Sequence, residues 1–483
     1  MSTAIPTHAD VVAAVSAYAP AELLPALARA SNAQLSRGDS PALPRPWSIA
    51  SLARECIAYS GPSQTGRITG AGLVRLGQLD LNQADPILTD VTPAAADSLA
   101  VRYLYQQVPF GAFQPLAELA RLVAVCDHAD ADYAALDLEV IREQTWVDLL
   151  GMPLRTFVRA AFVVFSLARQ ANGVFDPAQL ADPDLTRFGV TAEQALHVFH
   201  NMLAAELPAL QQRCAADRAS DPAMRRLDFN PLASTPFVGL GGGRYVAPSM
   251  HLVEKRISLT AIYHLGVAKY RTKFARDLGK LTEAYVGRQL DQLSHDALVP
   301  EQPYGSRKNR GKTCDWVLSM GGIATIVECK SARVPLYGQR DFDSHLAAVG
   351  RDVGASLAGQ VPVTAELIRS GDAVFSGFDL PTDVCAIVVT ADPFLMVNSE
   401  FYRSQLPDPG CPHAVLSLGE VEWFVATVLA GADAGSLIRE LTNTQVRVES
   451  VLAAASRRSG VDHPVNPLLM ATFDQMLTIG PAA

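Results

Sequence analysis

The sequence predicts a multidomain protein with a largely α-helical N-terminal region, an α/β core around a central mixed sheet, and a short helical C-terminal tail. The chain has 483 residues, more than a single hydrophobic core usually organises. Apolar residues recur with helical spacing before about residue 230, whereas strand-like and helical stretches alternate between about residues 295 and 430. From these changes in pattern we expect four parts, at residues 1–228, 229–268, 269–432 and 433–483.

Residues 1–228 are predicted to be helical because apolar residues lie three and four positions apart in several stretches. Three of these are VVAAVSAYAPAELLPALARA, FQPLAELARLVAVC and VDLLGMPLRTFVRAAFVVFSLARQ. His197 and His200, in ALHVFHNML, are three positions apart and could share a metal ion. No carboxylates cluster beside them, so an ordinary place on a helix surface or at the edge of a core is favoured.

Residues 229–268 are predicted to form a β-hairpin and a helical connector. The short β-rich runs PFVGL and RYVAPS flank Gly241–Gly243. Glycine clusters also occur in phosphate-binding loops, but no Gly-Lys-Ser/Thr motif follows and no helix begins there. A hairpin turn is therefore favoured.

The predicted core, residues 269–432, contains the strand-like runs of the mixed sheet. They read LVPEQPY, DWVLSM, IATIVECK, DVCAIVVTA and HAVLSL, and helical stretches lie between and after them. The tail returns to helical spacing in SLIRELTNTQVRVESVLAAA. Short strands interleaved with helices are typical of a sheet covered by helices.

The composition excludes several classes of protein. The seven cysteines are scattered without a CxxC pair, which argues against a zinc ribbon or a disulfide scaffold and predicts reduced thiols. The first residues lack the positively charged segment of a signal peptide. The longest apolar helical run, residues 160–168, is shorter than a membrane span. We therefore expect a cytoplasmic protein that makes no contact with a membrane.

Positive charge is concentrated in one part of an acidic chain. The net charge of −9 argues against a surface that is basic throughout. Residues 251–345, however, contain 15 basic and 10 acidic residues, and all seven lysines lie between Lys255 and Lys330. This window could be a contact surface for a polyanion or an ordinary solvated face, and charge alone leaves both interpretations open.

The run DWVLSMGGIATIVECK predicts a tight hairpin with an unusual pair of acids. Gly321–Gly322 suits a two-residue loop, because both central residues of such a loop take positive φ. The antiparallel register that pairs Met320 with Ile323 also pairs Asp315 with Glu328. Cβ atoms of a directly facing pair lie about 5 Å apart. We therefore expect two carboxylates side by side on one face of the sheet.

Two ionised carboxylates at about 5 Å repel by roughly 3 kcal/mol at an effective dielectric near 20. Protonation of one acid, exposure of both to water, or a divalent cation such as Mg²⁺ or Mn²⁺ relieves this repulsion. Lys330, two residues beyond Glu328, is predicted on the same face and offsets part of it. The alternative is an exposed edge hairpin with an ordinary salt bridge. Apolar residues on both faces favour a covered strand, in which acids without a purpose are uncommon.

Asp315, the hairpin and Glu328-Cys329-Lys330 resemble the PD-(D/E)XK, or restriction-endonuclease-like, nuclease superfamily. Its signature is an acid at the start of one core strand and an acid-x-lysine on the next. Cys314 stands where the name of the motif has proline, a departure that the superfamily tolerates. The run GEVEWF is similar to Mrr-like bacterial members, and the resemblance covers roughly residues 270 to 430.

Two further residues match roles that members of this superfamily use. Glu283, in LGKLTEAYVGRQLDQL, fits the acid that the helix before the core strands often supplies. Gln360, in ASLAGQV, fits the residue that points back to the site from the following helix. The resemblance implies a restriction-endonuclease-like core and a metal-dependent endonuclease. It implies that Asp315, Glu328 and Glu283 hold Mg²⁺ or Mn²⁺ and that Lys330 stands near the attacking water.

The segment SRKNRGK leads into the first acidic strand and is predicted to be a mobile cationic loop. Its basic residues are Arg307, Lys308, Arg310 and Lys312. Four positive charges without an aromatic residue predict contacts with a phosphate backbone rather than with bases. A solvated turn is the alternative. The expected partner is nucleic acid, with DNA favoured over RNA, and a role in bacterial or antiviral defence would suit the resemblance.

Two other functions stay open on the sequence. The nuclease fold could be catalytically inactive and serve as a nucleic-acid-binding or scaffold subunit. Alternatively, the chain could be a helical protein-interaction module in which the acids form a structural salt-bridge cluster. A homo-oligomer, or a partner protein bound through the N-terminal helical region, is compatible with all of these functions.

Overall fold

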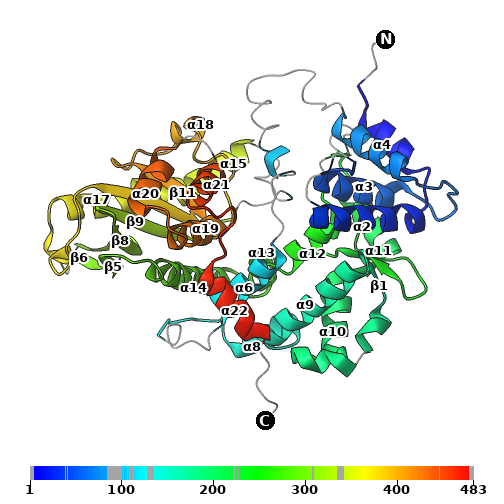
Figure 1. Cartoon of the computed structure of the whole chain (residues 1–483), viewed down its shortest axis with the longest axis horizontal. Helices are drawn as coiled ribbons and strands as arrows, with labels where there is room; N and C mark the ends of the chain where they lie inside the picture. Colours follow the sequence, from blue (N-terminus) through cyan, green and yellow to red (C-terminus); the bar gives the residue numbers. More distant parts are fainter. Residues whose placement is uncertain are drawn as a thin grey trace. The chain divides into compact units, whose positions relative to one another are not determined.

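The computed structural model describes residues 5–37, 40, 42–83, 101, 103–105, 107, 110, 114–127, 135–181, 183–220, 225–226, 228–306, 309–333, 342–444 and 447–477. The chain is mixed α/β, and it divides into two compact units. Unit 1 comprises residues 1–123, 143–262 and 473–483, and unit 2 comprises residues 124–142 and 263–472. Both are drawn in Figure 1.

The compact units divide the chain at other places than the four expected parts. The expected connector splits near residue 262, and residues 433–472 belong to unit 2 instead of forming a separate tail. Residues 124–142 also belong to unit 2, although they lie far from the strands of its sheet in the sequence. The physical reason is packing: C-terminal helices cover the central sheet, and a segment of the N-terminal region lies on a helix of unit 2.

Helices dominate the first 270 residues, as the apolar spacing predicts. Their bounds are α1 (His8–Val15), α2 (Pro20–Arg37), α3 (Pro46–Tyr59), α4 (Gly70–Leu81), α6 (Pro115–Cys126), α8 (Glu143–Leu150), α9 (Leu154–Gln170), α10 (Ala192–Val198), α11 (Leu207–Ala216), α12 (Met250–Arg256) and α13 (Leu259–Tyr270). Local signals set several ends: Thr7 forms a capping box with Asp10 at the start of α1. The apolar faces of α1, α2, α3, α4, α11 and α12 form one core, in which α2 and α3 pack on each other.

Unit 1 also holds a small four-stranded sheet of order β1-β4-β3-β2. The strands are β1 (Val174–Phe175), β2 (Ala204–Glu206), β3 (Phe237–Gly239) and β4 (Tyr245–Val246). The predicted hairpin is confirmed, since β3 and β4 pair antiparallel across Gly241–Gly243, all three of which have positive φ. The strands β1 and β2 come from segments that read as helical, and they join the hairpin only through tertiary contact.

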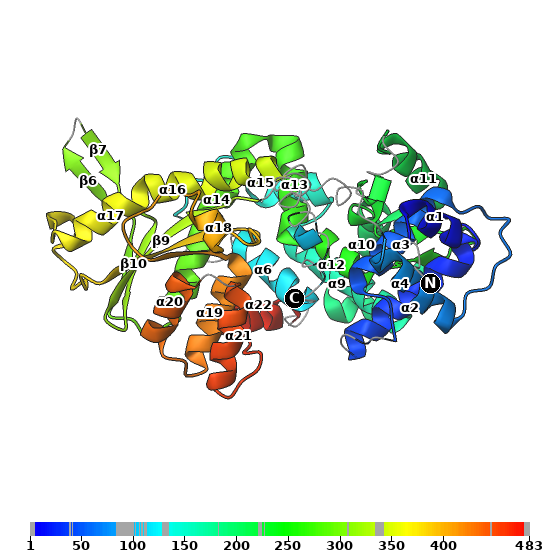
Figure 2. The same cartoon turned by 90° about the horizontal axis from the view of Figure 1, so that it is seen from above.

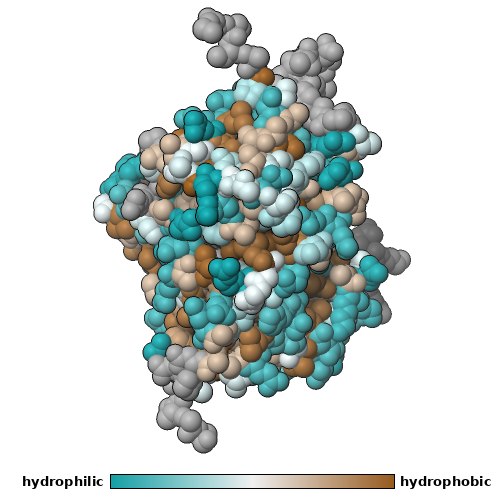
Figure 3. Space-filling model, turned by 90° about the vertical axis from the view of Figure 1, so that its right-hand side faces the viewer, coloured by the Kyte–Doolittle hydropathy of each residue, from teal (hydrophilic) through white to brown (hydrophobic). Residues whose placement is uncertain are grey.

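One helical stretch in the described part of the chain, Glu143–Gln170, has the length and apolarity of a membrane span. In the structure it is two helices, α8 and α9, and 56% of its most apolar window is buried within the protein. The bent pair His8–Val15 and Pro20–Ser36 passes the same test only if both helices are taken together. On the face shown in Figure 3, hydrophilic residues are interspersed with short bands of hydrophobic ones.

Unit 2 is built on a five-stranded sheet of order β11-β10-β9-β8-β5, and the predicted mixed sheet is confirmed. The strand β8 runs antiparallel to both of its neighbours, β5 and β9, whereas β9, β10 and β11 are parallel to one another. Their bounds are β5 (Ala297–Pro300), β8 (Trp316–Met320), β9 (Ile323–Lys330), β10 (Val384–Thr390) and β11 (His413–Ser417). A separate two-stranded ribbon, β6 (Pro303–Ser306) with β7 (Asn309–Lys312), projects beside them (Figure 2).

Helices cover both faces of this sheet (Figure 2). The helices α14 (Thr272–Asp291), α19 (Leu418–Leu429) and α20 (Ala434–Asn443) pack on one face, and α17 (Gln360–Arg369) packs on the other. Unit 2 also contains α15 (Phe342–Val349), α16 (Ala355–Ala358), α18 (Glu400–Arg403) and α21 (Val448–Arg458). The boundary between the two units falls within α22 (Pro467–Leu477). Because both faces are covered, β9 and β10 are apolar on both sides.

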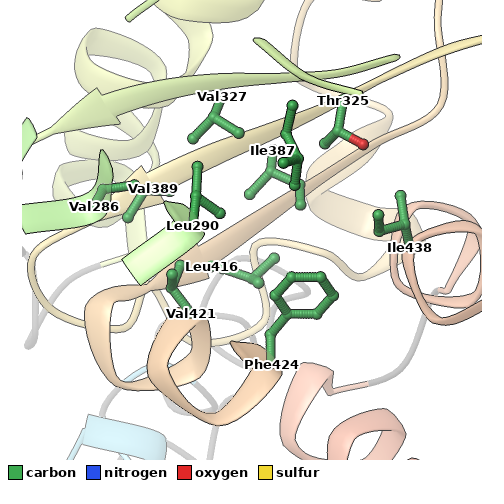
Figure 4. A pocket seen from close by; sticks show the side chains of 11 residues that line it. Val286, Leu290, Thr325, Val327, Ile387, Val389, Leu416, Val421, Phe424 and Ile438 are labelled. Atoms are coloured by element: carbon green, nitrogen blue, oxygen red, sulfur yellow. The ribbon is translucent and has the colours of Figure 1, made fainter. Parts of the chain in front are cut away.

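Alternation along β8 and β9 sorts side chains between the two faces. Val317 and Ile326 pack with Val361 of α17. Val327 instead points with Leu290 of α14 into a small apolar pocket on the opposite face (Figure 4). This division decides the face on which the acids at the end of the hairpin stand.

Candidate active site

The β8–β9 hairpin has the predicted register. Met320 pairs with Ile323 and Trp316 pairs with Val327, so Asp315 and Glu328 are the next facing positions. The turn residues Gly321 and Gly322 have φ of 60° and 73°, as a two-residue hairpin loop with two positive φ angles requires. The register therefore follows from the turn and from the period of two along each strand.

The facing acids have different surroundings. Asp315 Oδ2 accepts a 2.6 Å hydrogen bond from the backbone N–H of Cys329. Glu328 is 1% exposed, and its Oε1 accepts a 2.5 Å hydrogen bond from Lys330 Nζ. Its other oxygen, Oε2, is buried and has no hydrogen-bond partner among the residues that the structure describes. An unpaired buried carboxylate oxygen is costly, so this atom marks a place where a cation or a proton would be stabilised.

Three carboxylates interact electrostatically at this end of the hairpin. Burial, then the charges of Glu328 and Glu283, raise the pKa of Asp315 to about 8. Burial likewise raises the pKa of Glu283, and the charges of Glu301 and Glu328 add to the effect. A proton or another positive charge is therefore needed among these groups at neutral pH.

Lys330 supplies one positive charge. Burial works against its charged form, but the carboxylates of Glu328 and Asp315 outweigh burial and raise its pKa above the ordinary value. Its side chain is 32% exposed, whereas that of Glu328 is 1% exposed. Lys330 is thus a protonated amine that reaches from a buried carboxylate toward solvent. A salt bridge was part of the alternative interpretation of the sequence, but here it stands on a covered hairpin and not on an exposed edge.

Helix α14 brings Glu283 to the same place. The indole Nε1–H of Trp316, at the start of β8, donates a 3.1 Å hydrogen bond to the backbone carbonyl of Glu283. The ring of Trp316 lies against Gly287, where a Cβ atom would overlap it. The absence of a side chain at this glycine lets the helix approach the strand closely.

Gln360 has a different role from the one that the resemblance implies. Its Nε2 donates a 3.2 Å hydrogen bond to the carbonyl oxygen of Thr313, two residues before Asp315. Thr364, one turn further along α17, accepts a 3.0 Å hydrogen bond from the N–H of Cys314. Gln360 therefore contacts the backbone that leads into β8 and has no hydrogen bond with the acids. Sequence reasoning missed Thr364, although its spacing of four from Gln360 places both on one helix face.

The predicted cationic loop is a β-ribbon in its described part. Arg307 and Lys308 lie outside the described residues. Arg310 and Lys312 lie on β7, which pairs with β6. Lys312 Nζ forms a 2.6 Å ion pair with Glu301, and this contact raises the pKa of Lys312. Backbone pairing thus places the described residues of this segment in a ribbon, where we expected a mobile loop.

Among the described residues, no group of three or more His, Cys, Asp and Glu side chains has the geometry of a metal centre. His197 and His200 are included in this finding, and His197 Nδ1 lies 3.0 Å from Asn201 Nδ2. The pair Asp315 and Glu328 nevertheless suits Mg²⁺, an ion that proteins commonly hold through one or two carboxylates while it keeps several waters. The unpaired Glu328 Oε2 and the raised pKa of Asp315 both fit a cation at this position.

Comparison of the chain with known protein families, with curated proteins and with solved structures found no match.

Proposed function

We propose that the chain is a metal-dependent endonuclease that hydrolyses phosphodiester bonds, in DNA rather than RNA, and that unit 2 carries the catalytic site. The observation that carries this proposal is the meeting of Asp315 and Glu328 at one end of a covered hairpin, beside the amine of Lys330. The buried, unpaired Glu328 Oε2 supports a cation there. The resemblance to PD-(D/E)XK nucleases supports the reaction class.

In this proposal, Asp315 and Glu328 hold Mg²⁺ or Mn²⁺, and Glu283 contributes directly or through a water molecule. The bound ion would supply a Lewis acid for the phosphoryl oxygen and a water of lowered pKa. The hydrogen bond from the Cys329 N–H orients the Asp315 carboxylate before the ion arrives. Because Glu328 projects from a buried strand, its carboxylate is held with little freedom to turn away.

The chemistry of Lys330 suits charge neutralisation better than proton removal. A general base must lose its proton near neutral pH, whereas neighbouring carboxylates raise the pKa of Lys330. A protonated amine beside the scissile phosphate would offset the negative charge that grows during attack. Arg310 and Lys312 on β7, together with Arg307 and Lys308, would contact the phosphate backbone on either side.

Two other functions rest on specific observations. A catalytically inactive, nucleic-acid-binding scaffold is compatible with the ion pair of Lys330 and Glu328. A protein-interaction module is compatible with the lack of a three-ligand metal group among the described residues. The proposal also includes a role in defence and a cytoplasmic location. It further includes a homo-oligomer, or a partner protein bound through the N-terminal helices. The location is supported by the seven free cysteines.

The proposal is tested by nicking of supercoiled plasmid with the full-length chain. Wild type should nick in Mg²⁺ or Mn²⁺ and not in EDTA, and Glu328→Ala and Lys330→Ala should lose the activity. Glu366→Gln, which removes an exposed acid from α17, is the control and should nick as wild type does. DNA binding without nicking would favour the scaffold. Absence of nicking, of DNA binding and of a Mn²⁺-dependent thermal shift would favour the interaction module.

A further inference from the structure

Helix α14 carries a stripe of basic side chains that ends at the candidate active site. Lys273, Arg276, Lys280 and Glu283 stand at positions i, i+3, i+7 and i+10, so they lie along one face of the helix. Ten helical residues span about 15 Å. This length corresponds to four or five base pairs at ~3.4 Å each.

An acidic segment of unit 2 lies on this basic stripe. We call residues 135–142 the strap. Glu139 of the strap forms ion pairs with Lys273 and with Arg276, the latter at 3.2 Å. Lys280 Nζ donates a hydrogen bond to a backbone carbonyl oxygen of the strap. The strap therefore places one carboxylate between two cations, where a phosphate group would also fit.

The backbone of the strap is anchored independently of these ion pairs. The carboxylate of Asp277, which is fully buried, accepts hydrogen bonds from the N–H groups of Glu139, Val140 and Ile141 at 2.9, 2.6 and 2.9 Å. These three bonds do not involve the side chain of Glu139. The Glu139 carboxylate can consequently turn away from the stripe while the strap stays in place.

The cations of the stripe are available for exchange. The side chains of Lys273 and Arg276 are 58% and 64% exposed. Ion pairs at such exposed positions contribute little to stability and are screened by salt. A guanidinium also binds a phosphate through two parallel hydrogen bonds, which makes phosphate a strong competitor of a surface carboxylate.

We infer that Lys273, Arg276 and Lys280 form a contact surface for a phosphodiester backbone, and that phosphate displaces Glu139 when nucleic acid binds. The inference deepens the proposed function, since it takes nucleic acid as the polyanion. The stripe is distinct from the β6–β7 ribbon, because it lies on α14. It leads along that helix to Glu283, so a strand bound on it would extend toward the acids of the site.

The test measures binding of a short, labelled DNA duplex to the full-length chain by fluorescence anisotropy, in EDTA, over a range of salt concentrations. Without a divalent ion, cleavage does not contribute to the signal. Glu139→Gln should bind roughly three- to tenfold more tightly than wild type, because one competing charge is removed. Glu366→Gln changes the net charge equally at a distant exposed position, and it should bind as wild type does.

Removal of one cation from the stripe should reduce the salt dependence of DNA binding by a defined amount. Lys273→Ala and Arg276→Ala should each weaken binding and reduce the slope of log K against log salt by about one. Lys273→Arg keeps the charge and should restore the wild-type slope. Thermal unfolding of each variant checks that the fold is retained, and a merely structural role for these residues would leave the slope unchanged.

Three results would overturn the inference: no binding by any variant, equal affinities of Glu139→Gln and Glu366→Gln, or an unchanged slope in both alanine variants. Failure of the proposed function is a separate result. A chain that binds DNA through the stripe but never nicks plasmid in Mg²⁺ or Mn²⁺ would retain the contact surface and lose the catalytic role.

Discussion

The backbone N–H of Cys329 donates a 2.6 Å hydrogen bond to Oδ2 of Asp315. The bond crosses from β9 to the residue that precedes β8, and Cys329 is the neighbour of Glu328 in the chain. One cross-strand contact thus ties the Asp315 carboxylate to the backbone of the residue that follows Glu328. The same bond fixes the orientation of the Asp315 carboxylate. Burial and the charges of Glu328 and Glu283 raise the pKa of this carboxylate.

Asp315→Asn should stabilise the metal-free protein and abolish its response to metal. Asparagine keeps an oxygen that accepts the Cys329 N–H. Unlike Asp315, whose pKa rises to about 8 in the folded protein, it does not have to take up a proton when the chain folds at pH 7. We expect the free energy of unfolding in EDTA at pH 7 to rise by on the order of 1–3 kcal/mol. We expect Mn²⁺ to raise the unfolding temperature of wild type and to leave that of Asp315→Asn unchanged. A destabilised variant that still responds to Mn²⁺ would exclude Asp315 as a metal ligand.

Lys330→Met should lower the free energy of unfolding clearly, whereas Lys312→Met should lower it only slightly. The first change leaves Glu328, which is 1% exposed, without its cation, and we expect a loss of about 1–3 kcal/mol. The second breaks an ion pair in which the lysine side chain is 68% exposed, and we expect a loss below about 1 kcal/mol. Urea unfolding measures both values. Equal losses of stability in the two variants would show that the buried ion pair of Lys330 and Glu328 stabilises the fold no more than the exposed pair of Lys312 and Glu301.

Gly435→Ala should destabilise unit 2 by separating the hairpin turn from α20. A Cβ atom at Gly435 would lie 2.7 Å from the carbonyl oxygen of Gly321, and backbone atoms yield little. We expect a loss of about 1–3 kcal/mol in thermal or urea unfolding. Gly350→Ala is the control, because a Cβ there meets nothing within 4 Å. Equal stability of the two variants would contradict the close approach.

Glu254 should make stability fall as pH rises. Burial, and next the charge of Glu118, raise the pKa of Glu254 to about 8 from an ordinary value of 4.5. Between these two values the folded state binds more protons than the unfolded state, so the stabilising contribution is complete below pH 4.5 and is lost toward pH 8. The group belongs to unit 1, away from the candidate acids in sequence.

The measurement compares thermal unfolding of wild type and Glu254→Gln between pH 5 and pH 8. Glutamine keeps an oxygen that can accept the 2.7 Å hydrogen bond from the Gln114 N–H, but it does not titrate. The unfolding temperature of Glu254→Gln should therefore exceed that of wild type by the largest amount at pH 8. Glu193→Gln, at an exposed position, should follow the wild-type profile. Parallel profiles of wild type and Glu254→Gln would mean that Glu254 keeps its charge in the fold.

The hairpin register was predictable because it depends on neighbours in the chain. Two glycines set the turn, and a side-chain period of two carries the pairing from Met320 and Ile323 to the two acids. The β3–β4 hairpin was predicted for the same reason, and the mixed sheet was predicted from the alternation of strand-like and helical runs. The contact of Gln360 with the Thr313 carbonyl was not predictable, because two segments 47 residues apart must meet to make it.

The sequence alone determined the helical texture of the first 230 residues, the hairpin that pairs Asp315 with Glu328, and the face that Lys330 shares with them. These features follow from spacing along one short segment. Only the tertiary structure decided that residues 124–142 and 433–472 belong with the sheet, and that the strap covers the basic stripe of α14. The contacts of the strap join residues more than a hundred positions apart, and those of residues 433–472 join separate elements of the chain. No local periodicity or turn can indicate which of these surfaces will meet.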